Sequence, residues 1–375
     1  MTRARIAIVG GGLAGLYAAS LLEQHGVHDY VLLEARGDLG GRILSVAAGE
    51  ADTHGRFDLG PTWFWPAIQP QLDRLVRDLG LERFAQYESG DMLVERGGLP
   101  VQRMRGYANA PPSMRLTGGM AALTGALRQR LVRPNILAGH VVHQVRMPRA
   151  HVEVNGVDAQ GASFSWQVEH VLLALPPRLA MQTLAFDPPL PSALASQWRA
   201  TATWMAPHAK YVAVYAAPFW REHGLSGEAR SGRGPMAEIH DASLPGAGAA
   251  LFGFLGIPAP LRATLGEDAL RTHCRAQLVR LFGEEAGKPV AECVKDWAAD
   301  PFTATANDLH AGDGHGQAPA AGPDAGPWAG RLAGIGSEWS PQFPGYLAGA
   351  IEAAEAGVGA VLARGPRDLM RPVAA

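Results

Sequence analysis

Residues Ile6-Ala7-Ile8-Val9-Gly10-Gly11-Gly12-Leu13-Ala14-Gly15 join an apolar run directly to a glycine-rich turn. Four consecutive apolar residues are typical of a parallel strand that is buried on both faces. Residues 16–24 then carry a helical pattern that ends at Gly26, and a second apolar run, 30–33, ends in Glu34. Strand, glycine turn, helix and strand in this order predict a βαβ unit of an α/β, Rossmann-like domain.

The three glycines of the turn have different expected roles. Gly10 permits the tight turn, Gly12 lets a pyrophosphate approach the backbone, and Gly15 lets helix and strand pack closely. The anion would meet free N–H groups and the positive end of the helix. Glu34 lies where it can accept hydrogen bonds from ribose hydroxyls, which disfavours a 2′-phosphate there. The unit predicts a dinucleotide site over a merely flexible turn, but it does not separate NAD from FAD.

Composition narrows the function classes. A chain of 375 residues suits two lobes, and 47% hydrophobic with 18% charged residues is a soluble, globular balance. The formal charge of -2 provides no basic field for nucleic acid or an anionic membrane. Two cysteines form no disulfide framework, and the 13 histidines show no metal-binding spacing. We expect no metal.

The first 22 residues have some features of a secretory signal, namely two arginines followed by an apolar stretch. Four glycines interrupt that stretch, and it ends at Glu23 without a convincing cleavage site. A strand followed by a helix explains it better. No other run is long and apolar enough to span a bilayer, so we expect a cytoplasmic protein.

The residues after Glu34 distinguish the two dinucleotides. Glu34-Ala35-Arg36, followed by Gly40-Gly41-Arg42, resembles the Glu-Ala-Arg…Gly-Gly-Arg stretch of the flavin-dependent amine oxidase superfamily, the monoamine oxidase-like FAD oxidoreductases. Further segments resemble the same family: 58–63 beside the flavin ring, 116–120, Val142 near the adenine, 172–177, 333–338 and 344–352. The resemblance therefore implies FAD.

In this family the glutamate that corresponds to Glu338 here bonds the ribityl chain. The resemblance also implies that a helix beginning near Gly345 directs its N-terminus at the flavin pyrimidine. The residues that we expect to bind FAD are Gly10, Gly12, Leu13, Ala14, Gly15, Glu34, Ala35, Arg36, Gly41, Arg42, Gly60, Pro61, Thr62, Val142, Ala174, Trp297, Gly336, Glu338, Tyr346 and Leu347.

The resemblance also implies four catalytic or pocket residues. Lys210 opens a stretch similar to the family's lysine-bearing strand, in which the lysine reaches flavin N5 through water and favours reaction with oxygen. The alternative is an ordinary lysine at a strand edge. Trp297 matches a tryptophan beside the isoalloxazine, Tyr346 matches one wall of an aromatic cage, and Trp63 could border the same pocket. For Trp297 and Tyr346, core packing is the alternative.

The chain departs from the family pattern in three places. Counting from Trp297, the position of the flavin-linking cysteine holds Ala306, which predicts noncovalent FAD. The opposing cage aromatic is replaced by Asn307, which disfavours a small primary monoamine. Only 57 residues separate Gly60 from Gly118, where typical members carry a longer, mostly helical insertion. We therefore expect a short member with a reduced helical part of the substrate domain.

The cofactor motifs predict a discontinuous FAD domain over residues 1–68, 115–190 and 298–365, with an α+β substrate domain over 69–114 and 191–297. Residues 211–215 and 250–255 are predicted strands, and 261–282 is predicted helical. Residues 311–330 are rich in Gly, Ala and Pro and predict a surface loop. Residues 366–375 are expected to form a tail.

These observations predict an FAD-dependent oxidase that moves a hydride from a carbon next to nitrogen onto flavin N5, with reoxidation by O2 and formation of H2O2. The substrate is expected to be an amine or N-heterocycle. Alternatives are a renalase-like or other C–H dehydrogenase, a non-redox flavin mutase, and a non-enzymatic binding protein of the same fold. His240-Asp241 could act in acid–base chemistry, but a surface pair is the favoured interpretation.

Overall fold

The computed structural model describes residues 2–47, 55–132, 135–148, 151–309 and 316–364. The chain divides into two compact units. The first unit comprises Met1–Gly41, Thr124–Trp204 and Gly312–Ala375, and the second comprises Arg42–Leu123 and Met205–Ala311. This division differs from the domains expected from the cofactor motifs, for example over residues 42–68, so those domains stay a prediction. The expected tail, 366–375, lies outside the described residues.

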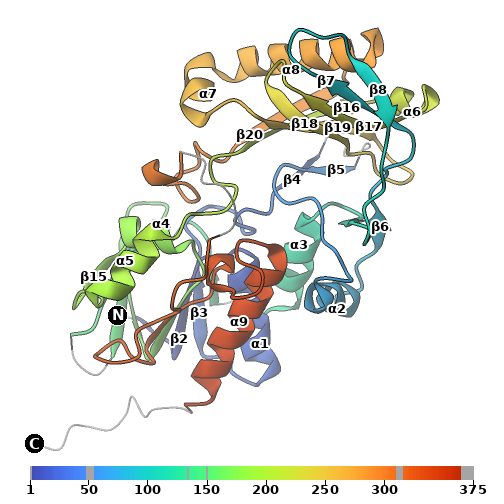
Figure 1. The fold of residues 1–375 in the computed structure, drawn as a ribbon. Helices are drawn as coiled ribbons and strands as arrows, with labels where there is room; N and C mark the ends of the chain where they lie inside the picture. Colours follow the sequence, from blue (N-terminus) through green and yellow to red (C-terminus); the bar gives the residue numbers. More distant parts are fainter. Residues whose placement is uncertain (1, 48–54, 133–134, 149–150, 310–315, 365–375) are drawn as a thin grey trace, which may run out of the picture. The chain divides into compact units, whose positions relative to one another are not determined.

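A five-stranded parallel sheet organises the first unit. Its strand order is β10 (Ile136–Leu137), β3 (Tyr30–Leu33), β2 (Ile6–Val9), β14 (His170–Leu173) and β21 (Leu332–Gly334). Every neighbouring pair is parallel. Helices α1 (Leu13–Gln24) and α9 (Leu347–Leu362) lie side by side next to it (Figure 1). The predicted α/β, Rossmann-like class is confirmed.

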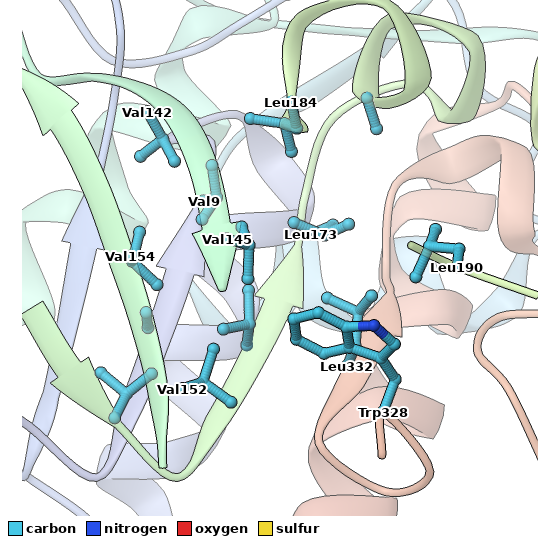
Figure 2. Packing of buried hydrophobic residues seen from close by; sticks show 14 of the residues in the cluster. Val9, Val142, Val145, Val152, Val154, Leu173, Leu184, Leu190, Trp328 and Leu332 are labelled. Atoms are coloured by element: carbon cyan, nitrogen blue, oxygen red, sulfur yellow. The ribbon is translucent and has the colours of Figure 1, made fainter. Parts of the chain in front are cut away.

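A second sheet packs against the parallel one. Its order is β1 (Thr2–Arg3), β13 (Ser163–Val168), β12 (Val152–Val157), β11 (Val141–Arg146) and β15 (Ala185–Asp187). Figure 2 shows Val145 and Val154 from this sheet in one core with Val9 and Leu173 from the parallel sheet. Helices α4 (Pro177–Thr183) and α5 (Ser192–Ala200) complete this region. The apolar faces of both sheets are thereby buried.

Trp328 corrects the prediction of a plain surface loop over residues 311–330. Residues 311–315 lie outside the described part, and 316–330 contain no helix or strand. Trp328 is nevertheless only 1% exposed, and its indole N–H donates to the Pro188 carbonyl at 2.8 Å. It lies in the same core as Leu332 (Figure 2). One tryptophan therefore anchors a stretch whose average composition predicts no core contact.

A seven-stranded mixed sheet organises the second unit. Its order is β20 (Ala291–Asp296), β16 (Ala209–Tyr215), β19 (Ala249–Leu255), β18 (Met236–Asp241), β17 (Leu225–Ser231), β7 (Asp91–Glu95) and β8 (Gln102–Arg105). The strands predicted at 211–215 and 250–255 are confirmed. The single helix predicted over 261–282 is wrong, because Gly266 (φ 77°) separates α7 (Ala259–Leu265) from α8 (Glu267–Phe282).

The two faces of this sheet are covered differently. On one face, strand residues including Tyr211 and Ile239 pack with α8 residues including Leu278. On the other, Val212 and Phe252 pack with the hairpin of β4 (Ser45–Ala47) and β5 (Arg56–Asp58). The remaining elements are α2 (Pro70–Asp78), α3 (Ala121–Arg130), α6 (Phe219–Glu222), β6 (Arg83–Ala85), β9 (Met114–Leu116) and the short 3-10 turns Glu284–Gly287, Ala306–Asp308 and Ser337–Trp339.

Candidate active site

The residues expected from the sequence to form the site fall into both units. The first unit contains Gly10, Gly12, Leu13, Ala14, Gly15, Glu34, Ala35, Arg36, Gly41, Val142, Ala174, Gly336, Glu338, Tyr346 and Leu347, and the second contains Arg42, Gly60, Pro61, Thr62, Trp63, Lys210 and Trp297.

The glycine turn forms a backbone cradle at the end of β2. Gly10 has φ 110°, and a Cβ there would lie 2.6 Å from the Ala174 carbonyl oxygen. A Cβ on Gly15 would lie 1.9 Å from the Gly10 carbonyl oxygen, so the first turn of α1 touches the strand end. Around Gly12, by contrast, the nearest atom to a Cβ is the Gly41 Cα at 3.7 Å. The turn is tightly packed where α1 meets β2, but space remains beside Gly12, where an anion would approach.

Glu34 follows β3 and is 4% exposed. Its carboxylate accepts the Gly11 N–H at 2.6 Å and the Arg36 N–H at 2.9 Å. These bonds fix the carboxylate beside the glycine turn. Because the two oxygens of an ionised carboxylate carry several lone pairs, Glu34 can still accept hydrogen bonds from a ribose.

Other expected residues lie at the carboxyl ends of adjacent parallel strands. Ala174 follows β14, and its N–H donates to the Val9 carbonyl at 2.7 Å. Gly336 follows β21, where a Cβ would lie 3.0 Å from the Leu175 carbonyl oxygen. Ligands of open parallel sheets bind outside this edge. Val142 differs, since its side chain lies in the core and only its backbone is available.

The C-terminal motif forms a turn and a helix start. Glu338 is buried in the turn Ser337–Trp339, with the Ser337 hydroxyl 3.2 Å from its carboxylate. Tyr346 is the N-cap of α9, and the first turn of this helix, which begins at Leu347, contains no acidic residue. The helix N-terminus therefore keeps its positive partial charge for a bound anionic group. Together with the glycine cradle, this donor set fits a flavin dinucleotide.

Lys210 occupies the interior of the seven-stranded sheet, because β16 lies between β20 and β19. Its side chain is 2% exposed, so the strand-edge alternative is wrong. The ammonium donates to the Gly60 carbonyl at 3.2 Å and to the Thr62 hydroxyl. It also lies 4.0 Å from the centroid of the Phe252 ring. Lys210 is therefore bonded to the segment that the family resemblance places beside the flavin.

Burial lowers the pKa of Lys210 to about 7, partly opposed by the negative charge of Asp58 and assisted by the positive charge of Arg115. Burial also raises the pKa of Asp58, although Lys210 and the Ser45 hydroxyl, 2.5 Å from the carboxylate, act in the opposite direction. Arg115 donates to the carbonyls of Ser243 and Ala242, both at 2.9 Å. This buried charge group could not be predicted from the sequence, because its members are far apart along the chain.

A stability measurement tests the burial of this charge. The folded protein releases the Lys210 proton near pH 7, whereas the unfolded chain holds it to about 10.5. Between these values the unfolded state binds more protons, so stability rises with pH. In urea titrations, we expect the difference between the free energy of unfolding of the wild type and that of Lys210→Met to increase in favour of the wild type from pH 7 to 10.5. A constant difference would contradict a depressed pKa.

Two tryptophans lie at the same segment, residues 59–63. The Trp297 indole N–H donates to the Leu59 carbonyl at 2.9 Å, and its side chain is buried. Trp63 donates to the Gln86 amide oxygen at 2.8 Å and lies edge-on to His240, with ring centroids 4.9 Å apart. The structure thus brings Lys210, Trp297 and Trp63 together around residues 59–63.

The positions that depart from the family pattern lie in a short 3-10 turn, Ala306–Asp308. Asp308 accepts from the Thr305 N–H at 2.9 Å and from the Thr305 hydroxyl at 2.7 Å, which caps the turn. Ala306 and Asn307 are both exposed. Ala306 offers no sulfur for a covalent flavin bond.

The surface pair predicted for His240-Asp241 is wrong. Asp241 is 1% exposed and accepts the Trp220 indole N–H at 2.8 Å and the Arg221 guanidinium at 2.9 Å. His240 points to the other face of β18, because successive strand residues alternate, and it is half-buried against Trp63. Its hydrogen-bond partner is Glu238, at 2.6 Å.

Comparison with known proteins fits this geometry. Residues 101–362 match the family described as flavin containing amine oxidoreductase. The chain belongs to this family. Residues 8–79 of this amine oxidoreductase also match an NAD(P)-binding Rossmann-like domain. The predicted family and enzyme class, a flavin-dependent oxidoreductase, are confirmed, and the alternative of a non-enzymatic binding protein is wrong.

Two relatives and one solved structure illustrate what this amine oxidoreductase is similar to. AofH of Mycobacterium tuberculosis, whose name proposes a flavin-containing monoamine oxidase, is 27% identical over 79% of this chain and 83% of its own. The L-amino acid dehydrogenase of Synechocystis is 25% identical over 67% of this chain and 52% of its own. A structure of wild-type putrescine oxidase bound to putrescine superposes with a TM-score of 0.79 at 19% identity, covering 96% of this chain and 99% of that one. The similarity to putrescine oxidase shows a shared fold alone.

None of the helices among the described residues is long and apolar enough to cross a membrane. Within the same described ranges, no group of three or more His, Cys, Asp or Glu side chains could hold a metal ion.

Proposed function

We propose that this flavin amine oxidoreductase holds FAD without a covalent bond and oxidises a carbon next to nitrogen, with O2 as the electron acceptor and H2O2 as a product. When bound, FAD supplies the hydride acceptor. The observation that carries the proposal is the buried Lys210 ammonium, bonded to Gly60 and Thr62 in the segment that resembles the family's flavin-contacting segment. A cytoplasmic location, predicted from the sequence, belongs to the same proposal.

The first unit would bind the cofactor. The α1 N-terminus behind Gly12 would bind the diphosphate, and Glu34 would accept hydrogen bonds from the ribose. Glu338 would bond the ribityl chain, while the N-terminus of α9 would favour negative charge on the pyrimidine. Ala306 supports a noncovalent attachment, since an alanine forms no thioether.

The second unit would provide the reaction environment. Trp297 and Trp63 are large, mostly apolar surfaces that exclude water and orient a substrate. Lys210, when protonated, would favour negative charge developing nearby. The family resemblance assigns Tyr346 the role of an aromatic wall. Asn307, in place of the family's opposing cage aromatic, disfavours a small primary monoamine.

A dehydrogenase is the second candidate. It would share the hydride transfer but pass electrons to an acceptor other than O2, and the similarity to an L-amino acid dehydrogenase supports it. Lys210 favours the oxidase, because a buried cation assists reduction of dioxygen. A renalase-like dihydropyridine oxidation is consistent with the short segment between Gly60 and Gly118.

Anaerobic flavin reduction tests the proposal. We expect the purified protein to be yellow and to release FAD into the supernatant on acid precipitation. Among alkylamines, diamines, arylalkylamines and dihydropyridines, at least one amine should bleach the flavin without oxygen, and air should restore the colour with H2O2 formed. Bleaching by dihydropyridines alone would favour the renalase-like alternative. Flavin that no compound reduces would contradict the oxidoreductase proposal.

A further inference from the structure

A carboxylate–imidazole pair lies on the face of the seven-stranded sheet that also carries Lys210. Glu238 and His240 are two residues apart on β18, so both side chains leave the same face. In the sheet register Glu238 and Lys210 both pair with Phe254. The ring of Phe252, 4.0 Å from the Lys210 ammonium, is also 5.4 Å from the His240 ring. His240 and Lys210 therefore border the same phenylalanine.

The hydrogen bond to Glu238 determines the tautomer of His240. Burial would raise the pKa of Glu238, but His240 and Arg230 outweigh it and lower that pKa. The ionised carboxylate can only accept, so Nε2 of His240 carries the hydrogen of the 2.6 Å bond. In the neutral form of the imidazole, Nδ1 is then left with a lone pair. No described residue donates a hydrogen bond to Nδ1, and the side chain keeps 13% exposure.

Aromatic side chains border the imidazole of His240. Trp63 meets the ring edge-on at 4.9 Å, and aromatic faces attract an ammonium group. The charged groups that border the imidazole within this unit are Glu238, with Arg230 paired to it, and Lys210 across Phe252. Asp241 points to the opposite face and is bonded there by Arg221. The nearest carboxylate therefore belongs to the pair itself.

We propose that His240 is a further catalytic residue, whose Nδ1 accepts a proton from the ammonium group of an amine substrate held against Trp63. One N–H bond of the ammonium breaks and an Nδ1–H bond forms, while the electron pair stays on the substrate nitrogen. No oxidant is consumed in this step, and a neutral amine is left for oxidation. Glu238 is a positioning residue that holds the tautomer and stabilises the imidazolium. This role rests on the proposed function.

The test is the pH dependence of anaerobic flavin reduction at saturating amine. We expect His240→Gln to reduce flavin about 10²-fold more slowly than wild type near pH 7, the contribution typical of a general base. At a pH above the pKa of the amine, free amine no longer needs a base, so the variant should recover to near the wild-type rate. A residue that only packs would give the same loss at every pH.

Two variants complete the test. His273→Gln, on the exposed side of α8, should leave the rate and its pH profile unchanged. Glu238→Gln keeps the shape of the pair but removes its negative charge. We expect a smaller loss in the rate of flavin reduction than in His240→Gln, and a shift in the pH at which that rate rises. Long-range ¹H–¹⁵N correlation spectra provide a readout without turnover. The resonance lost in His240→Gln should show an unprotonated Nδ1 and a protonated Nε2.

The outcomes separate the two proposals. Wild-type flavin that no amine reduces overturns the proposed function and this role together. Wild-type flavin that an amine reduces, with an unchanged pH profile or a loss without high-pH recovery in His240→Gln, overturns only the role of His240. A protonated Nδ1 in the wild-type spectrum near pH 7 likewise overturns it.

Discussion

Gly15→Ala is expected to weaken flavin binding on the order of 10²-fold, because overpacking of this kind costs about 1–3 kcal/mol or more. The new Cβ would lie 1.9 Å from the Gly10 carbonyl oxygen. Both atoms are bonded directly to the backbone, so neither can move away unless the chain moves with it. Helix α1 must shift away from the end of β2, which displaces the N–H groups that would bind the diphosphate. The measurement is flavin absorbance per protein after gel filtration, followed by titration with FAD.

Gly125→Ala is the matched control. Gly125 lies within α3, and a Cβ there would meet no atom within 4 Å. Alanine is favoured over glycine inside a helix, so we expect full flavin binding and about 0.5–1 kcal/mol of added stability. Equal flavin content in both variants, with both folded by circular dichroism, would refute the role of the Gly15 contact.

Lys210→Met is expected to slow reoxidation of the photoreduced flavin by O2 on the order of 10²-fold, the loss typical of removing one preorganised electrostatic group. Methionine retains much of the volume between Thr62 and Phe252 but carries no charge. Stopped-flow mixing with aerated buffer measures the rate. In the wild type the rate should fall as pH rises through the pKa of Lys210, about 7 without flavin, because the charged form is the active one.

Lys288→Met, at an exposed turn, is the control and should react with oxygen at the wild-type rate. Anaerobic reduction of the flavin by an amine should change much less in Lys210→Met than reoxidation does. A fast oxygen reaction that persists in Lys210→Met would contradict the role of the lysine. A slow reaction in both proteins would favour the dehydrogenase candidate.

Local patterns predicted the parts of the fold that depend on neighbouring residues. The run 6–9, the glycine turn and Glu34 form one βαβ unit, and their geometry follows from strand burial and glycine conformation. The strand containing Lys210 was also predicted, although helix α1 begins three residues earlier than its apolar pattern does, at Leu13 instead of residue 16. Helix boundaries depend on backbone geometry that hydrophobic periodicity does not report.

Contacts between distant residues could not be predicted in this way. Asp58, Arg115 and Lys210 influence one another's pKa values only because three separate segments meet in the fold. Trp328 is buried although the composition around it predicts a loop, since a single large side chain can anchor a polar or small-residue stretch. The partner of His240 was available from the sequence, because residues two apart on a strand share a face, whereas adjacent ones do not.

The three-part construction of the first unit has a consequence for how the protein folds. Strand β2 pairs with β14, with Ile6 opposite His170, and β14 in turn pairs with β21, with Leu173 opposite Gly334. A ribosome must therefore translate through residue 334 before the sheet can be completed, and contacts at such separation make folding slow. The apolar strand β2 can pair early with β3, but it remains without its other neighbour, β14, until residues 170–173 have been synthesised.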